Sequence, residues 1–108
     1  MKIPEEVQCE LDAKGGIKAL IANLPDVKSL KSQAKFFGAL ADEKRLRILA
    51  VLNSQPLCVC VIKSALKIPD SKLSYHLSVL KGAGLVKSKE KKNWIIYEIT
   101  DAGRQIFG

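Results

Sequence analysis

The sequence has little of what enzymes, membrane proteins and secreted proteins need. It contains one histidine with no partnered nucleophile, so it offers no acid–base set for catalysis. Its longest uninterrupted apolar run, "LCVCVI" (57–62), is far too short to cross a bilayer. The start, "MKIPEEVQCE", has Pro and Glu where a signal peptide needs an apolar stretch. We therefore expect a cytoplasmic protein that is not an enzyme, with no membrane partner and no small-molecule substrate.

Cysteine is also scarce. The chain has three, an odd number, and thiols stay reduced inside the cell, so ligands or core residues are favoured over a disulfide framework. The length of 108 residues suits one domain with a single core. An apolar content of 47% and a mean hydropathy of +0.05 predict a packed fold rather than disorder.

The charge of the chain is positive and unevenly distributed. Lys and Arg number 18 against 11 Asp and Glu, which gives a net charge of +7. Residues 58–92 hold eight Lys against Asp70 and Glu90, whereas residues 93–108 are slightly acidic. A basic block within an apolar-patterned region is typical of proteins that bind a polyanion such as nucleic acid. The alternative is a solvated, lysine-rich surface without a partner.

Hydrophobic periodicity predicts an N-terminal arm followed by helices. Residues 1–16 show weak periodicity and end in two glycines, so we interpret them as an arm and residues 17–108 as one domain. "IKALIANL" (17–24) predicts a short helix, and Asp26 is placed to cap a longer one. The apolar stripe of that longer helix comprises Val27, Leu30, Ala34, Phe37 and Ala41.

Three further helices are predicted before the last part of the chain. Asp42 is placed to cap "EKRLRILAVLN", whose apolar residues cover most of its circumference and predict a nearly buried helix. Ser54 is the predicted N-cap of "QPLCVCVIKSAL", with Pro56 in its first turn. The apolar spacing continues to Leu66, which favours a helix over a strand for "LCVCVI". "DSKLSYHLSVLKGAG" predicts a helix directly after Pro69, and two short helices joined by a tight turn form a helix-turn-helix.

The tail of the chain alternates like a β-hairpin. "LVKSK" and "WIIYEIT" flank "EKKN", and Ile95, Tyr97 and Ile99 share one face of the second strand. A helix-turn-helix followed by two strands with a basic tip is a winged helix. The predicted fold class is therefore mainly α with a β-hairpin, a winged helix-turn-helix.

The outward face of the second short helix is the candidate DNA-reading surface. Leu73, Leu77 and Leu80 face the core, and small hydroxyls, one aromatic residue and one Lys point the other way. Hydroxyls bond to base edges or phosphates, although an ordinary polar helix face is the alternative. His76 lies about 70° off the core stripe, which favours a boundary histidine or a phosphate contact over a metal ligand. The predicted DNA-binding residues are Ser71, Lys72, Ser74, Tyr75, His76, Ser78, Lys87, Lys89, Lys91 and Lys92.

Four stretches between about residues 33 and 100 carry a family resemblance. They are "FFGALADEKRLRILAVL", "LCVCVI", "SKLSYHLSVLKGAGLVKSK" and "NWIIYEIT". Together they resemble the ArsR–SmtB family of metal- and metalloid-responsive winged-helix repressors, in which S-x-x-S-x-H-L-x-x-L is a strong signature. The resemblance implies a homodimer that reads operator DNA and pairs through its first and last helices. Because the tail is short, the predicted dimerisation residues are Val27, Leu30, Ala34 and Phe37.

The thiols of "LCVCVI" match the same family. Its arsenic and cadmium sensors carry Cys-Val-Cys at this point, matched position for position by Cys58-Val59-Cys60. Pro56 and Val61 replace the Glu and Asp usual in the family, and Lys63 stands where arsenic repressors have a third Cys. The cadmium/lead type takes thiols from an N-terminal arm, which here contains Cys9. The tail "DAGRQIFG" has no His, so the zinc site of other members is not expected.

The resemblance thus implies a metal site at Cys58, Cys60 and Cys9. The implied inducers are As(III)/Sb(III) or Cd(II)/Pb(II), with no cofactor required for DNA binding. Helical residues i and i+2 point about 200° apart, so both thiols could share an ion only if the first turn near Leu57 unwinds. Lys63 and the helix N-terminus are expected to favour the thiolate form. The alternatives are a redox-sensing thiol pair, inert cysteines without a metal response, or a winged-helix module for protein–protein contact.

Overall fold

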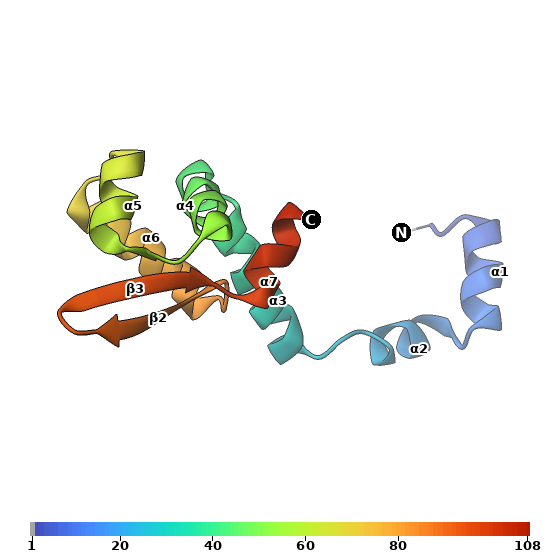
Figure 1. The fold of residues 1–108 in the computed structure, drawn as a ribbon. Helices are drawn as coiled ribbons and strands as arrows, with labels where there is room; N and C mark the ends of the chain where they lie inside the picture. The colour runs from blue at the N-terminus through green and yellow to red at the C-terminus, as the bar shows by residue number, and fades with distance from the viewer. Residues whose placement is uncertain (1) are drawn as a thin grey trace. The chain divides into compact units, whose positions relative to one another are not determined.

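The computed structural model describes residues 2–108, and most of them are helical (Figure 1). The helices are α1 (Glu5–Ala13), α2 (Gly16–Ala22), α3 (Val27–Leu40), α4 (Glu43–Ser54), α5 (Val59–Leu66), α6 (Asp70–Gly82) and α7 (Asp101–Arg104), followed by a 3-10 turn at Gln105–Phe107. The strands are β1 (Leu57–Cys58), β2 (Val86–Lys91) and β3 (Trp94–Ile99). Within this described range, no helix combines the length and the apolar character that a membrane span requires.

The chain divides into two compact units, Met1–Leu30 and Lys31–Gly108. The first unit contains α1, α2 and the start of α3, and none of its described residues is buried. The predicted arm over residues 1–16 therefore contains a helix, α1, whose first turn carries Glu5 and Glu6, where acidic residues stabilise the helix dipole. The division between the units falls within α3 rather than after residue 16.

The second unit packs around one apolar core. Its fully buried large side chains come from α4, α5, α6 and the residue before β2. They are Ile48, Leu49, Leu52, Ile62, Leu73, Leu77, Leu80 and Leu85. The predicted core stripe of α6 is thereby confirmed. The prediction that α4 is nearly buried is wrong: Ile48, Leu49 and Leu52 are its buried residues, whereas Leu46 and most charged residues of its first turns are exposed.

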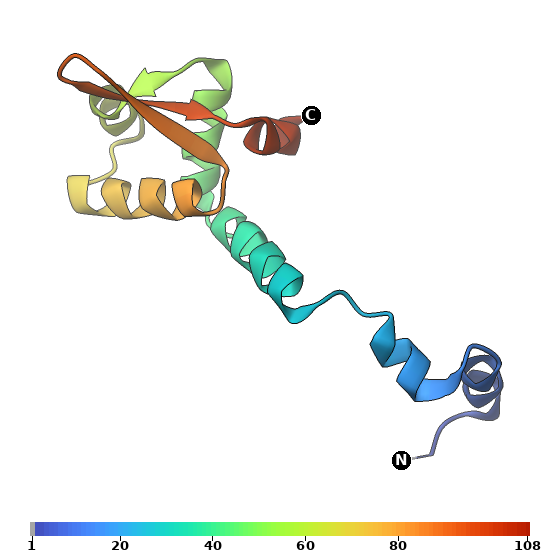
Figure 2. The same cartoon turned by 90° about the horizontal axis from the view of Figure 1, so that it is seen from below.

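A three-stranded antiparallel sheet with the order β1-β3-β2 completes this unit. Figures 1 and 2 show its long hairpin lying alongside α5 and α6. The pairing runs from Val86 opposite Ile99 to Lys91 opposite Trp94. The hairpin predicted from the sequence is confirmed, with a tighter turn than "EKKN": only Lys92 and Asn93 remain unpaired, and Lys92 has the left-handed φ of 58° that short hairpin turns favour.

The predicted helix start before "LCVCVI" is wrong. Ser54 is the last residue of α4 rather than an N-cap, and Leu57 and Cys58 form β1 opposite Tyr97 and Ile96 of β3. Helix α5 begins only at Val59. The stretch thus begins as a short strand and continues as a helix. Helical spacing could not show where the strand ends, because its partner β3 lies far along the chain.

The predicted helix caps are confirmed for two helices. The carboxylate of Asp26 accepts a hydrogen bond from the Ser29 backbone N–H at 2.7 Å, and Asp42 accepts one from the Arg45 N–H at 3.1 Å. These bonds lower the pKa of both carboxyls. The two caps fix where α3 and α4 begin, and α4 positions the pair α5–α6 around the core.

Candidate functional site

The polar face of α6 lies on the surface. Ser71, Lys72, Ser74 and Ser78 are exposed, and Tyr75 is 62% exposed. This agrees with the helical-wheel placement, because the same helix buries its leucines on the opposite side. The face offers hydroxyl groups, one aromatic ring and one ammonium group to a partner, and its DNA-binding role stays a prediction.

His76 is the exception among the predicted DNA-binding residues of α6. It is only 7% exposed, and its ring Nδ1 lies 3.2 Å from a guanidinium nitrogen of Arg45. Burial is the main cause that lowers the pKa of His76, so the neutral ring accepts the hydrogen bond from Arg45. Of the two roles that the sequence favoured, the boundary histidine fits this environment. The His76 side chain is thus largely buried against Arg45, and its contact with DNA stays a prediction.

Arg45 connects three helices. Its Nε donates to the carbonyl of Ala39 at 2.7 Å and a terminal nitrogen donates to that of Gly38 at 3.3 Å, both at the end of α3. Through His76 it also holds α6. Sequence reasoning missed this role, since Lys44 and Arg47 are basic residues of the same helix and nothing local distinguishes Arg45 from them.

The four hairpin lysines differ in their surroundings. Lys87 and Lys89 form ion pairs with Glu98 of β3, at 3.8 and 2.5 Å. The hydrogen bond from Lys89 lowers the pKa of Glu98, so this carboxylate stays ionised beside them. Lys91 and Lys92 are exposed at the end of the hairpin. From the sequence we expected all four lysines to contact DNA alike. The position of Glu98 opposite Lys87 follows only from the register of the two strands.

The thiol pair lies where β1 passes into α5. Cys58 has extended backbone angles (φ −76°, ψ 159°) and Cys60 belongs to the first turn of α5, which brings their two sulfurs within 2.8 Å. The predicted unwinding of a helical turn is therefore not needed: an extended Cys58 already places both thiols on one side. This is a correction of the helix-based expectation.

The two thiols are electronically unequal. The hydrogen bond from Cys60 lowers the pKa of Cys58, and the backbone N–H of Val61 at the helix start lowers it further. The same bond raises the pKa of Cys60. The expected contribution of the helix N-terminus is thus present, whereas the ammonium group of Lys63 pairs with Asp70 at 2.8 Å. The thiolate form is accordingly favoured at Cys58.

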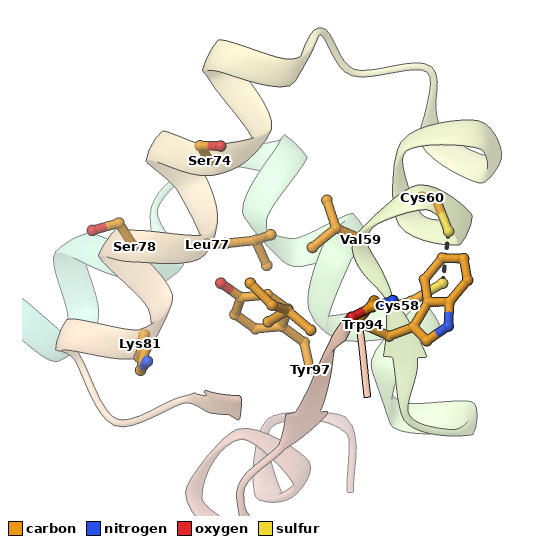
Figure 3. Close-up of a pocket in the computed structure, with 11 residues that line it drawn as sticks. Cys58, Val59, Cys60, Ser74, Leu77, Ser78, Lys81, Trp94 and Tyr97 are labelled. Atoms are coloured by element: carbon orange, nitrogen blue, oxygen red, sulfur yellow. Dashed lines mark hydrogen bonds between the residues drawn. The ribbon is translucent and has the colours of Figure 1, made fainter. Parts of the chain in front are cut away.

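A cavity of about 620 Å³ adjoins the thiol pair (Figure 3). Cys58 and Cys60 line it at the start of α5, Ser74 and Ser78 line it from α6, and Trp94 is one of its residues from β3. In Figure 3 the Trp94 ring lies beside the two sulfurs. No local pattern in the sequence could have associated this tryptophan with the cysteines, because the β1–β3 pairing brings them together.

The donor set suits a thiophilic ion but is incomplete by itself. Two sulfurs that share an ion with bonds of about 2.3 Å lie within roughly 4 Å of each other, which this pair satisfies. Across residues 2–108, no group of three or more His, Cys, Asp or Glu side chains is arranged to hold a metal ion. Cys9 is exposed on α1 in the first unit, and its participation stays a prediction.

The predicted dimerisation residues lie exposed along α3. Val27 is 67%, Leu30 44% and Phe37 62% exposed, and Ala34 is exposed as well. Phe37 packs edge-on against Phe36, whose own side chain is partly buried against the core. The stripe therefore does not close the core of the monomer, and its role in pairing stays a prediction.

The chain is similar to known regulators. The sequence model described as "Bacterial regulatory protein, arsR family" matches residues 42–88. A protein from Synechocystis, the transcriptional repressor SmtB homolog, is 39% identical over 71% of this chain and 61% of its own length. The arsenical resistance operon repressor of Bacillus subtilis is 38% identical over 67% of this chain and 70% of its own length.

Solved structures agree with these sequence matches. The homodimeric winged helix-turn-helix DNA-binding domain of Mb0332 from Mycobacterium bovis, a possible ArsR-family transcriptional regulator, superposes with a TM-score of 0.70. It is 29% identical and covers 80% of this chain and 82% of its own. The winged helix-turn-helix fold and the non-enzymatic character predicted from the sequence are thereby confirmed. This chain is a member of the ArsR family of transcriptional regulators.

Proposed function

We propose that this protein is a cytoplasmic repressor that binds operator DNA as a homodimer and leaves it when a thiophilic ion binds. Two kinds of observation support this. Relatives are named as a transcriptional repressor and an arsenical resistance operon repressor, and the Mycobacterium bovis domain is named as homodimeric. The chain itself has a hydroxyl-rich helix face next to a basic hairpin, and a close pair of thiols at the start of the same helix-turn-helix.

The observation that carries the DNA-binding proposal is the exposed face of α6. Its hydroxyls and Tyr75 enter a major groove and meet base edges and phosphates, while Lys72 adds charge. Lys91 and Lys92 at the hairpin end reach further phosphates. Lys87 and Lys89 contribute less, because Glu98 already neutralises part of their charge.

Homodimerisation follows from the size of this face. One winged helix neutralises few phosphates, whereas two copies with recognition helices about 34–36 Å apart read an inverted repeat and double the contacts. The exposed stripe of α3 supplies the apolar surface for that pairing. An apolar stripe with Phe37 at 62% exposure is the type of surface that an interface buries.

Release depends on the position of the thiol pair. Cys58 belongs to β1, which is paired with β3 of the hairpin, and Cys60 belongs to α5, the first helix of the DNA-reading pair. The sulfurs lie 2.8 Å apart, within the roughly 4 Å that a shared ion allows, so an ion bound to both links β1 to the start of α5 and acts on the hairpin and the DNA-reading pair together. A loss of DNA affinity of 10²–10³ needs a coupling of only about 3–4 kcal/mol. Cys9 is the proposed third ligand for an ion that takes three sulfurs.

A salt titration of DNA binding tests the repressor proposal. A fluorescent duplex from the promoter region of the chain's own gene is titrated with the protein at several salt concentrations. Phosphate contact gives a steep linear fall of log affinity with log salt, and Lys92→Ala reduces the slope by about one contact per subunit. A flat salt dependence would favour the protein–protein module instead.

The ion response is tested with cysteine variants on the same duplex. Cys58→Ser should bind the operator as the wild type does but resist release by arsenite or cadmium, since one of the two sulfurs that share the ion is lost. Cys9→Ser should retain release by cadmium at a higher concentration if Cys9 is a third ligand. Equal release of wild type and Cys58→Ser would disprove the sensor, and response to peroxide alone would favour a redox switch.

A further inference from the structure

The cavity beside the thiol pair is larger and more apolar than a bare ion requires. Cys58 and Cys60 line one side of it, and Val59, Leu77, Tyr97 and Trp94 contribute aliphatic and aromatic walls. Figure 3 shows the side chains of Val59, Leu77 and Tyr97 pointing toward one another across it, with the Trp94 ring over the sulfurs. Its volume of about 620 Å³ lies within the range of small-molecule sites.

The number of thiols at this place limits the chemistry. A trivalent arsenic centre forms three bonds, and arsenite, As(OH)3, therefore needs a third sulfur to exchange all of its hydroxyls. Within residues 31–108 the thiols are those of Cys58 and Cys60, and their sulfurs lie 2.8 Å apart. An arsenical that carries one carbon substituent, R–As(OH)2, has just two exchangeable hydroxyls. Its valence matches the two thiols.

We propose that the ligand of this site is a trivalent organoarsenical with one aromatic substituent, a proposal that rests on the proposed function. Cys58 and Cys60 each form one As–S bond, two As–O bonds break, and the two thiol protons leave with the hydroxyls as two waters. Arsenic stays trivalent and the As–C bond stays intact, so no oxidant or reductant takes part. The aromatic substituent lies against Trp94 and Tyr97.

The same cavity connects the ligand to DNA release. Ser74 and Ser78 of the proposed DNA-reading face line it together with the thiols. A substituent that fills the cavity therefore lies next to the face that enters the major groove, and it opposes DNA binding by its bulk. An ion held by the sulfurs alone lacks this second effect. The aromatic ligand is thus the stronger inducer per bound molecule.

The test compares phenyl and methyl arsenicals on the full-length protein. Phenylarsine oxide and methylarsonous acid are each titrated into the operator complex, and the concentration that releases half of the DNA is recorded. The phenyl-to-methyl preference is divided by the preference of dithiothreitol, a free dithiol, for the same two compounds. Burial of the ring should leave a corrected preference of about ten-fold or more in the wild type. Cys9→Ser should keep this preference, whereas Cys58→Ser and Cys60→Ser should lose response to both compounds.

Trp94→Ala removes the aromatic wall without touching the core, since Trp94 is 56% exposed. It should lower the corrected preference toward one, and Trp94→Phe should retain most of it. If Trp94→Ala does not fold, Val59→Ala shortens the opposite wall and should lower the preference to a smaller degree. A corrected preference near one in the wild type, or its loss in Cys9→Ser, would overturn the proposal.

Different results would disprove the aromatic ligand and the proposed repressor function. If the protein binds operator and is released by cadmium or arsenite but shows no phenyl preference, only the aromatic ligand is wrong. If it does not bind operator at all, the proposed function is wrong, and the arsenicals can still be compared by mass spectrometry of the adducts. In that measurement a phenylarsenic adduct spanning Cys58 and Cys60, lost in either Cys→Ser variant and retained in Cys9→Ser, still supports the ligand.

Discussion

Residues 2–30 and residues 31–108 both contain amphipathic helices, yet they bury their apolar side chains very differently. All thirteen buried apolar residues of the described range 2–108 come from 31–108. In 2–30 the large apolar residues of α2 and the turn after it, Ile17, Leu20, Ile21 and Leu24, are 54–61% exposed. The first part therefore has helices without buried side chains, and the second has the core that holds α6 in place. The residues that stabilise the fold thus lie in 31–108, whereas residues 2–30 leave their apolar side chains on the surface.

Truncating a leucine in each part should show the largest difference. Leu49 is fully buried in α4, so Leu49→Ala should lower the free energy of unfolding by about 2–5 kcal/mol. Leu20→Ala is the matched substitution in α2, where the side chain is 59% exposed, and should change it by less than about 0.5 kcal/mol. Urea unfolding of both variants at a protein concentration where the chain is monomeric measures the contrast. Similar losses in the two variants would mean that residues 2–30 contribute to the core.

The exposed stripe of α3 sharpens the same contrast, because it lies across the boundary between the two units. Phe37→Ala should leave the core intact but weaken homodimerisation by about ten- to a hundred-fold, the range for a buried aromatic anchor at an interface. Sedimentation equilibrium gives the dimer dissociation constant. Ser32→Ala, on the opposite side of α3, is the control and should leave it unchanged. A wild-type chain that stays monomeric at all accessible concentrations would contradict the proposed stripe.

Much of the fold from residue 26 onward could be predicted from the sequence, because its signals are local. Asp26 and Asp42 cap the helices that follow them, and Leu73, Leu77 and Leu80 recur at the spacing of one helix face. The alternating tail and its turn residues predict the hairpin. Each of these features depends on residues a few positions apart, so the pattern itself contains the physical cause.

What the sequence could not reveal depends on contacts between distant segments. The start of α5 is displaced because Leu57 and Cys58 pair with β3, and this pairing also brings Trp94 to the thiols. Glu98 neutralises Lys87 and Lys89 only in the observed register. None of these partners can be identified from spacing alone. The expected helical geometry of Cys58 and Cys60 was therefore wrong, and their role as ligands stays a prediction.

The smallest expected effect is the change of the free energy of unfolding with pH. It should again come from residues 31–108 rather than from residues 2–30. His76 in the second unit is the only buried titratable side chain among residues 2–108. Burial lowers the pKa of His76 below its ordinary value near 6.5, the nearby charges of Arg45, Lys44 and Lys72 lower it further, and the carboxylate of Asp42 opposes them. At pH 7 and above the ring is neutral in both states. As the pH falls through about 6.5, the unfolded chain binds a proton that the folded chain does not yet bind, so the free energy of unfolding decreases toward pH 5.

His76→Gln isolates this contribution, since the glutamine amide does not titrate and its oxygen can still accept the bond from Arg45. Urea unfolding at pH 5, 6, 7 and 8 should show a decline toward low pH in the wild type and a flatter profile in the variant. The carboxyls of Asp26, Asp42 and Glu98 have lowered pKa values and lose their stabilising contribution only below about pH 4, outside this window. An equally steep profile in His76→Gln would assign the proton uptake to another group and would remove the reason to regard the Arg45–His76 contact as a neutral link between α4 and α6.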